Sequence, residues 1–254
     1  MINEMDPSSE IIVLDDPVAL AGAAAEAIAE CAVEAVDARG RFTIALAGGL
    51  TPRTTYERLA ASPLRERIPW DHMWVFFGDE RCVPPDHADS NYRMAEQALL
   101  SRVPIPAKQV ARIHGEAEDA EVAASEYGRH MSEVFQIRRG ELPRFDLILL
   151  GLGVDGHTGS LFPGSPVLKE VFRPVAAVHA GAASIPQRIT FTFPVINAAA
   201  RVMFLVAGAE KAKVLKVVLN EPASGLPAAL VSPQRGRLTW LLDRAAAALL
   251  KVAK

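Results

Sequence analysis

Short apolar segments alternate along this chain with longer segments of helical character, and this order limits the folds that the chain can adopt. Strands are predicted at 42–47, 73–77, 146–150, 202–207 and 228–231, and helices at 17–38, 52–61, 91–101, 120–137 and 210–219. Consecutive strands separated by helices need crossover connections, which favour a mainly parallel sheet with helices on both faces. The sequence therefore predicts an α/β fold whose binding residues gather at the carboxyl edge of the sheet.

One segment departs from this pattern. Between 188 and 193, Ile189, Phe191 and Phe193 alternate with two threonines. Such alternation predicts a half-exposed strand, either antiparallel or part of a small additional subdomain.

Composition narrows the class of protein. The chain has 254 residues, half of them apolar, and a formal net charge of −3, which suits a single domain over 1–254. No basic excess favours a nucleic-acid partner, so we expect a small-molecule partner. Cys31 and Cys82 form no CxxC pair, which fits a reducing compartment. Three glutamates interrupt the alanine-rich stretch 17–37, so we expect neither a signal peptide nor a membrane span, and a cytoplasmic location.

The apolar run 146–150 ends in glycines that carry Asp155 and His157. A buried parallel strand that ends in such a loop delivers its side chains to the crevice where sites of open α/β sheets form. A histidine side chain titrates near neutral pH and is therefore a candidate general base. Asp155 is expected either to orient this imidazole or to hold backbone donors in the turn.

The same loop has the G-x-G-x-x-G spacing of a dinucleotide site at Gly151, Gly153 and Gly156. That fingerprint requires a helix to begin at its third glycine. Pro163 and Pro166 leave no room for several helical turns, so we reject a dinucleotide site and predict a loop.

A second loop, Gly48-Gly49-Leu50-Thr51-Pro52, follows the strand 42–47. Its glycines permit close approach of a ligand, Thr51 is a candidate cap for the next helix, and Pro52 suits a first helical turn. The free N–H groups and the helix dipole make this a candidate phosphate site. A simple capped turn explains the segment equally well.

Charged and polar residues follow the strand 73–77, namely Asp79, Glu80 and Arg81, with Asn91 a little further along. Arg81 is a candidate donor to a carbonyl or phosphate oxygen, and the two carboxylates are candidates for orienting it or binding sugar hydroxyls. A solvated loop would have the same composition. Nothing in the sequence near Cys82 argues for a reactive thiol.

Two further cations are candidate anion contacts. Lys211 falls in the first turn of the helix predicted at 210–219, where a positive charge is unfavourable beside the dipole unless an anion binds. Arg188 begins the threonine-containing strand. A side chain extended into solvent is the alternative for both.

Together these segments resemble the 6-phosphogluconolactonase family of the glucosamine-6-phosphate isomerase group. The matching stretches are 48–52, 77–84 with Ser90-Asn91, 151–164, and 188–211. The resemblance implies a modified Rossmann-like (glucosamine-6-phosphate isomerase-like) fold and hydrolysis of 6-phosphoglucono-1,5-lactone in the oxidative pentose phosphate pathway. It implies no metal and no organic cofactor, and we expect a monomer or a weak homodimer. The residues that would act on the substrate are His157, Asp155 and Arg81, and those that would bind it are Gly48, Gly49, Thr51, Asp79, Glu80, Asn91, Arg188 and Lys211.

The chain departs from the family patterns at two positions. Leu50 stands where lactonases commonly have a serine, so a hydroxyl contact is lost but the backbone donors remain. Phe162 stands where the related amino-sugar phosphate deaminases have a catalytic glutamate, which argues against amine release. A deaminase and a non-catalytic sugar-phosphate sensor remain the alternatives, whereas a serine esterase is disfavoured because no G-x-S-x-G elbow occurs.

Overall fold

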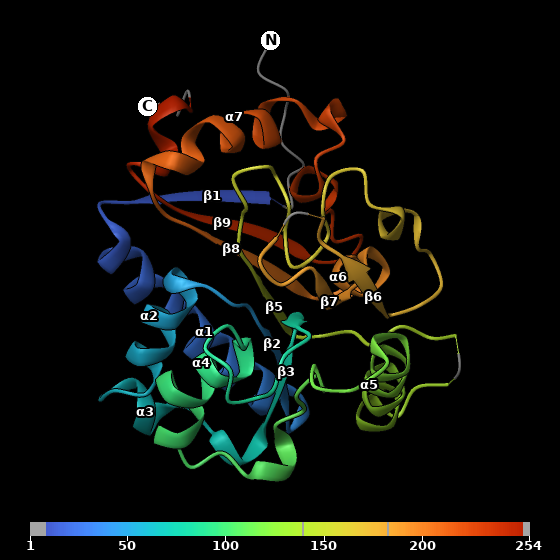
Figure 1. Cartoon of the computed structure of the whole chain (residues 1–254). Coiled ribbons are helices and arrows are strands. Elements are labelled where there is room, and N and C mark those ends of the chain that lie inside the picture. The colour runs from blue at the N-terminus through green and yellow to red at the C-terminus, as the bar shows by residue number, and fades with distance from the viewer. Residues whose placement is uncertain (1–8, 139, 182, 251–254) are drawn as a thin grey trace.

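The computed structural model describes residues 9–138, 140–181 and 183–250, and a parallel sheet forms its centre (Figure 1). Six strands run in the order β1-β9-β8-β5-β2-β3, and every adjacent pair is parallel. They are β1 Ser9–Leu14, β2 Phe42–Leu46, β3 Met73–Phe77, β5 Leu147–Leu150, β8 Arg201–Val206 and β9 Arg237–Asp243. The predicted α/β class is therefore confirmed.

A second, antiparallel sheet lies beside the first. Its strands follow the order β4-β7-β6, with β4 at Asp79–Arg81, β6 at Val175–His179 and β7 at Gln187–Phe191. Helix α5 packs on this sheet, and the N–H of Phe191 donates to the carbonyl oxygen of Gly78 (2.7 Å). This unit is the small antiparallel addition that the alternation at 188–193 predicted.

Helices surround both sheets. The α-helices are α1 Pro17–Arg39, α2 Leu50–Leu59, α3 Leu64–Arg67, α4 Asn91–Ala98, α5 Ala120–Phe135, α6 Phe193–Ala198 and α7 Ala212–Asn220. Short 3₁₀ turns occur at Trp70–His72, Leu100–Arg102, Ala107–Gln109, Pro166–Lys169, Ala209–Lys211, Pro222–Ser224, Pro227–Leu230 and Ala246–Leu249. Helix α1 begins where Asp16 accepts the N–H of Ala19 (2.8 Å), and it ends at Gly40, whose φ of 73° suits only a residue without a Cβ.

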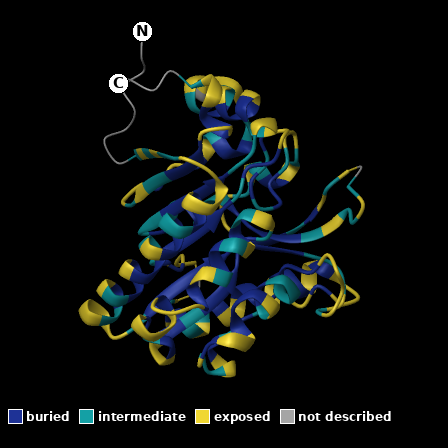
Figure 2. Ribbon diagram, turned by 90° about the vertical axis from the view of Figure 1, so that its left-hand side faces the viewer, coloured by how far each residue is buried: buried dark blue, intermediate teal, exposed yellow. Residues whose placement is uncertain are grey.

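The core lies on both faces of the parallel sheet. Every residue of β2 and of β5 is buried, and because strand side chains alternate between faces, both faces must be covered. Figure 2 shows the buried strands inside helices whose outer surfaces are exposed. One apolar cluster includes residues of both sheets. The single domain over 1–254 stays a prediction, and residues 1–8 and 251–254 lie outside the described part.

Three details of the predicted strands were wrong. Residues 228–231 form no strand, because a 3₁₀ turn that starts at Pro227 occupies Pro227–Leu230. Strands β1, β4, β6 and β9 were not predicted. The strand predicted at 188–193 ends at Phe191. Thr190, on the face predicted to be exposed, is buried because helix α5 covers one side of the small sheet and the His157 loop covers the other.

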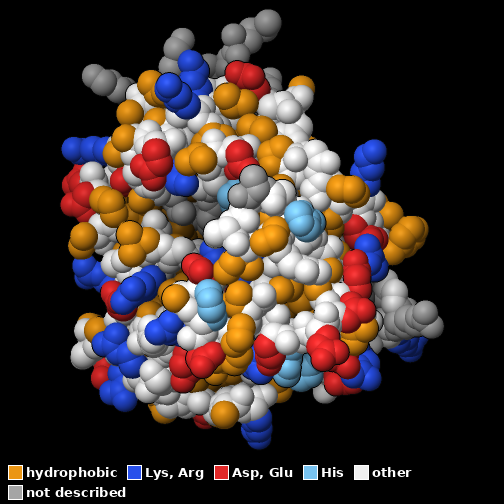
Figure 3. Space-filling model, viewed as in Figure 1, with side chains coloured by type: hydrophobic (Ala, Val, Ile, Leu, Met, Phe, Trp, Pro, Cys, Tyr) orange, Lys and Arg blue, Asp and Glu red, His pale blue; other side chains and the backbone are white. Residues whose placement is uncertain are grey.

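Charges on the face drawn in Figure 3 are mixed, with basic and acidic side chains interspersed. None of the helices in the described ranges is both long enough and apolar enough to cross a membrane.

Candidate active site

The site lies where the chain leaves two neighbouring central strands in opposite directions. From β2 the chain proceeds to β3 on one side, and from β5 to β8 on the other. Ligands of open α/β sheets bind at such a switch point, beyond the carboxyl ends of the strands. A cavity of about 330 Å³ occupies this place.

Most of the predicted site residues line this one cavity. They are Gly48, Gly49, Asp79, Arg81, Asn91, His157, Arg188 and Lys211. Three predicted residues do not line it, namely Thr51, Glu80 and Asp155. The eight residues come from five separate segments of the chain, namely 48–49, 79–91, the His157 loop, β7 and the turn after β8.

His157 and Asp155 form a close pair. Nδ1 of the imidazole lies 2.6 Å from Oδ1 of Asp155, and the same oxygen accepts the N–H of His157 (3.2 Å). Burial raises the pKa of the Asp155 carboxyl, but this N–H bond and the nearby imidazole outweigh it and hold the pKa below its usual value. An ionised carboxylate only accepts hydrogen bonds, so Nδ1 is the donor of this pair, and in the neutral imidazole Nε2 is then the acceptor. Asp155 therefore both contacts the imidazole and holds a backbone donor of the turn, which are the two alternatives that the sequence left open.

The glycine at 153 makes this pair possible. A Cβ at that position would lie 2.1 Å from Nδ1 of His157 and 2.7 Å from Oδ1 of Asp155. The loop closes on itself, because Gly153 N–H donates to the carbonyl oxygen of His157 (2.8 Å). The 3₁₀ segment Pro227–Leu230, which was wrongly predicted as a strand, supports the loop, since Ala228 N–H donates to the carbonyl oxygen of Gly156 (3.0 Å). No helix follows the glycines directly, which confirms the structural reason for rejecting a dinucleotide site.

Two arginines face each other across the small sheet. Arg81 on β4 and Arg188 on β7 are partners in the antiparallel register. Burial, and next the charge of Arg81, lower the pKa of Arg188. Nε of Arg81 is buried without a hydrogen-bond partner among the described residues. Like charges placed opposite one another are unfavourable unless an anion joins them, so this pair is suited to an anionic oxygen.

Phe162 connects the two halves of the site. Its ring centroid lies 4.6 Å from that of the His157 imidazole, and Cζ of Arg188 lies 5.8 Å from the same ring. The aromatic side chain thus restricts both the candidate base and one candidate anion contact. In the sequence, Phe162 was noted only as the position of a missing glutamate.

Asp79 belongs to a buried polar group at the wall of the cavity. It is 7% exposed, its Oδ2 accepts the hydroxyl of Ser160 (2.7 Å), and its backbone oxygen accepts the side-chain amide of Asn91 (2.9 Å). The remaining acceptor capacity of Asp79 is suited to a sugar hydroxyl. The sequence analysis considered a serine only as the nucleophile of an esterase and named no role for Ser160, although its position three residues after His157 was available as a signal.

Glu80 is turned away from the cavity and is 3% exposed. Its two oxygens accept the hydroxyl of Ser90 (3.0 Å) and the backbone N–H groups of Arg81, Asn91 and Tyr92 (2.8 Å each). Burial raises the pKa of its carboxyl even though these donors act in the opposite direction. Glu80 therefore joins β4 to the start of α4, and its oxygens are already occupied.

The glycine loop after β2 is an uncapped helix start. Helix α2 begins at Leu50 with Gly49 as its N-cap, and no side chain caps it, so the predicted cap at Thr51 is wrong. The first-turn N–H groups are left for a ligand. A Cβ at Gly48 would lie 1.9 Å from Oδ1 of Asn91, so only glycine fits there. The hydroxyl of Tyr56 donates to the carbonyl oxygen of Ala47 (2.9 Å) and thereby fixes the approach to the loop.

Lys211 approaches from the loop after β8. It ends the 3₁₀ turn Ala209–Lys211 directly before α7, and it lines the same cavity as the glycine loop. The N–H of Gly208 donates to the buried carboxylate of Asp243 (3.1 Å to Oδ2), which fixes the start of this turn. The described residues contain no group of three His, Cys, Asp or Glu side chains arranged to hold a metal ion.

The chain is similar to known proteins over nearly its whole length. A family model described as glucosamine-6-phosphate isomerases/6-phosphogluconolactonase matches residues 15–240. A 6-phosphogluconolactonase of a Nostoc species is 43% identical over 94% of this chain and 98% of its own, and the rat 6-phosphogluconolactonase is 42% identical over 95% and 94%. The structure of 6-phosphogluconolactonase from Trypanosoma cruzi superimposes with a TM-score of 0.87 at 32% identity, covering 98% of this chain and all of that one. The chain belongs to the glucosamine-6-phosphate isomerase/6-phosphogluconolactonase family.

Proposed function

We propose that this chain hydrolyses 6-phosphoglucono-1,5-lactone to 6-phosphogluconate, the second step of the oxidative pentose phosphate pathway. The observation that carries the proposal is the pairing of His157 with Asp155 on a cavity that also exposes the uncapped start of α2. The relatives with 42–43% identity are named as lactonases of this substrate. No metal or organic cofactor is needed for the reaction.

His157 acts as the general base. With Nδ1 bonded to Asp155, Nε2 removes a proton from a water molecule that attacks C1 of the lactone. A tetrahedral intermediate forms with negative charge on the former carbonyl oxygen. Its collapse breaks the bond between C1 and the ring oxygen, which takes the proton back from Nε2. One imidazole thus serves both steps, and the products are a carboxylic acid and a free hydroxyl.

The side chain of Arg81 stabilises the developing charge. Arg81 lines the cavity with a buried Nε that lacks a partner among the residues described, so it can donate to the oxyanion without first giving up another bond. Donors held in place in this way contribute roughly 10²–10³ in rate.

The phosphate occupies the other end of the cavity. Gly48, Gly49 and Lys211 surround it with backbone donors and one positive charge, with Arg188 as a further contact. Binding at this unreactive end positions the carbonyl group at the reactive end. Asp79 and Asn91 line the same cavity and are suited to sugar hydroxyls. Thr51 offers its backbone N–H in the first turn of α2, whereas Glu80 holds the start of α4 instead of contacting substrate.

The test is hydrolysis of freshly generated lactone, measured with and without the protein against the spontaneous background. We expect a clear acceleration that His157→Ala reduces by about 10²–10⁴. The same variant should bind 6-phosphogluconate with nearly unchanged affinity. Near-normal turnover by His157→Ala would remove the proposed base.

Ammonia release from glucosamine 6-phosphate would instead support a deaminase, and binding without turnover would support a sensor. The apolar Phe162 at the position of the deaminase glutamate favours the lactonase. A cytoplasmic location and a monomeric or weakly dimeric state stay predictions, which fractionation and size-exclusion chromatography test.

A further inference from the structure

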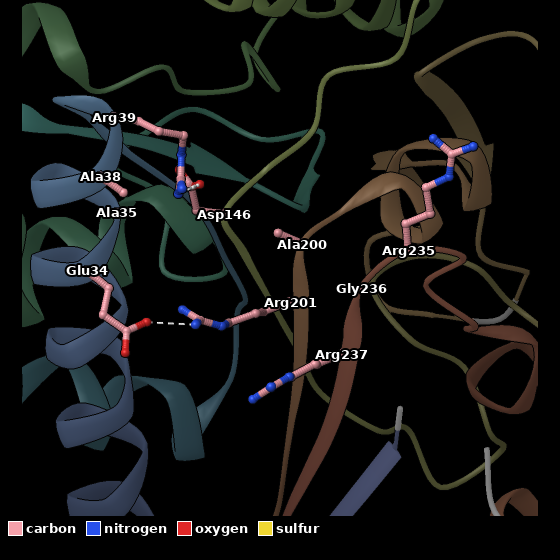
Figure 4. A pocket seen from close by; sticks show the side chains of 10 residues that line it. All are labelled: Glu34, Ala35, Ala38, Arg39, Asp146, Ala200, Arg201, Arg235, Gly236 and Arg237. Atoms are coloured by element: carbon pink, nitrogen blue, oxygen red, sulfur yellow. Dashed lines mark hydrogen bonds and ion pairs between the residues drawn. The ribbon is translucent and has the colours of Figure 1, made fainter. Parts of the chain in front are cut away.

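A second cavity lies at the amino ends of the strands, on the opposite edge of the parallel sheet from the candidate active site. Its volume is about 700 Å³. Its walls come from the last turns of α1 and from the chain just before or at the starts of β5, β8 and β9 (Figure 4). The lining residues are Glu34, Ala35, Ala38, Arg39, Asp146, Ala200, Arg201, Arg235, Gly236 and Arg237.

Two arginines stand side by side at the centre of this cavity. Arg201 on β8 and Arg237 on β9 are partners in the parallel register. In Figure 4 both side chains extend toward α1, whereas Arg235 points away from them. Adjacent like charges are unfavourable in a sheet. This is the same register arrangement that Arg81 and Arg188 have at the active site.

Only one of these two arginines has an acidic partner. Glu34 accepts from Nη2 of Arg201 (2.7 Å), and Sγ of Cys31 accepts from its Nη1 (3.0 Å). Asp146 is largely engaged, since its oxygens accept the N–H and the hydroxyl of Thr43 (2.8 Å each) and a bond from Arg39 (2.5 Å). The guanidinium of Arg237 has no partner within the described ranges. Arg39 pairs with Asp146 and Arg201 with Glu34, and Arg235 points away (Figure 4), so Arg237 is the positive charge in the cavity that no carboxylate balances.

Three alanines line the cavity between its charged residues. Ala35 and Ala38 on α1 and Ala200 before β8 contribute only methyl groups. A cavity of this size holds a small organic molecule and not merely an ion. A flat or aliphatic portion of a ligand would fit against the alanines while its anionic group meets the arginines.

We propose that this cavity is a second binding site, separate from the active site, for an organic phosphate with at least two negative charges. Guanidinium groups donate in a planar fork that matches phosphate oxygens, so Arg237 forms the main anion contact, and Arg39 and Arg201 add the N–H groups that their bonds to Asp146, Glu34 and Cys31 leave over. A nucleoside diphosphate has the required size and a planar portion for the alanine wall.

Calorimetric titration at low ionic strength tests the proposal, with inorganic pyrophosphate and ADP as probes. The wild-type chain should bind two equivalents of each probe, and 6-phosphogluconate should displace the one at the active site. Arg237→Gln should weaken only the other equivalent, by about tenfold to a hundredfold, and leave lactone hydrolysis unchanged. Lys211→Gln should instead weaken the equivalent at the active site and leave the equivalent in the second cavity unchanged.

Ala38→Glu provides a second variant that changes no arginine. It places a carboxylate on an exposed position of the cavity wall and should abolish the second equivalent. ADP should bind more tightly than pyrophosphate, because only ADP contacts the alanines. A single equivalent in the wild-type chain, fully displaced by 6-phosphogluconate, would overturn the proposal, as would unchanged binding by both variants. These readouts do not depend on lactone turnover, so they fail or succeed independently of the proposed function.

Discussion

Substituting Gly153 with alanine should disable the catalytic pair without removing any functional side chain. The added Cβ would lie 2.1 Å from Nδ1 of His157, whereas ordinary van der Waals contact begins at 3.4 Å. The imidazole must therefore move by more than about 1 Å, and the 2.6 Å bond to Asp155 breaks. Misplacement on this scale costs about 10² in rate.

The expected cost in stability is small. His157 is 31% exposed, and its ring can rotate toward solvent to relieve the contact. Gly153 has no left-handed φ that an alanine would strain. Gly153→Ala should therefore lower kcat for lactone hydrolysis by about a hundredfold, while the midpoint of urea unfolding changes little.

Gly22→Ala is the matched control. That glycine lies inside α1 with nothing within 4 Å of the new methyl group, so the variant should keep full activity and gain at most about 1 kcal/mol of helix stability. Adding Asp155→Ala to Gly153→Ala should lower kcat little further, because the broken bond is already lost. Normal kcat in Gly153→Ala would refute the assignment of His157 and Asp155 as a positioned pair.

Three other substitutions test separate parts of the structure. Glu80→Gln places an amide where four donors point at a carboxylate. The free energy of unfolding, measured in urea, should therefore fall by about 1–3 kcal/mol, with KM nearly unchanged. Phe162→Ala removes the ring beside His157 and should lower kcat about tenfold, whereas Phe172→Ala, at a position 85% exposed, should not. Backbone N–H groups, first that of Arg173, lower the pKa of Glu170 to about 2. Because this pKa lies below the unfolded value of about 4.3, the carboxylate stabilises the fold at neutral pH. That stability is lost as the pH falls toward 2, and the difference between wild type and Glu170→Gln in urea unfolding should shrink between pH 6 and pH 3.

The sequence predicted the centre of the fold better than its borders. Strands β2, β3, β5 and β8 are apolar runs bounded by glycine or polar residues, so their pattern alone locates them. Strand β9 was missed because its run, RLTWLLD, mixes charged and polar residues with apolar ones, although it lies inside the sheet between β1 and β8. The 3₁₀ turn at Pro227–Leu230 was mistaken for a strand because four apolar residues have no periodicity that separates the two.

The sequence also predicted the candidate site only in part. Loops that follow central strands were predicted to meet because parallel strands end at one edge, and Gly48, His157 and Lys211 do line one cavity. The inward or outward direction of single side chains was beyond the sequence. Glu80 and Asp79 are neighbours on one short strand, and the alternation of that strand sends one carboxylate to the helix start and the other to the cavity.

The active cavity is built from two separate sheets, and this has a mechanical consequence. His157 follows a strand of the parallel sheet, whereas Arg81 and Arg188 belong to the small one. Any tilt of the small sheet therefore changes the distances from the base to Arg81, the oxyanion donor, and to Arg188, the phosphate contact. Tyr127 of α5 resists such a tilt, because its hydroxyl bridges the backbone of Phe77 and Ala111 (2.8 Å from the N–H of Phe77, 3.2 Å to the oxygen of Ala111). Helix α5, which contributes no residue to the cavity, thus acts as a brace that keeps the two halves of the reaction centre in alignment.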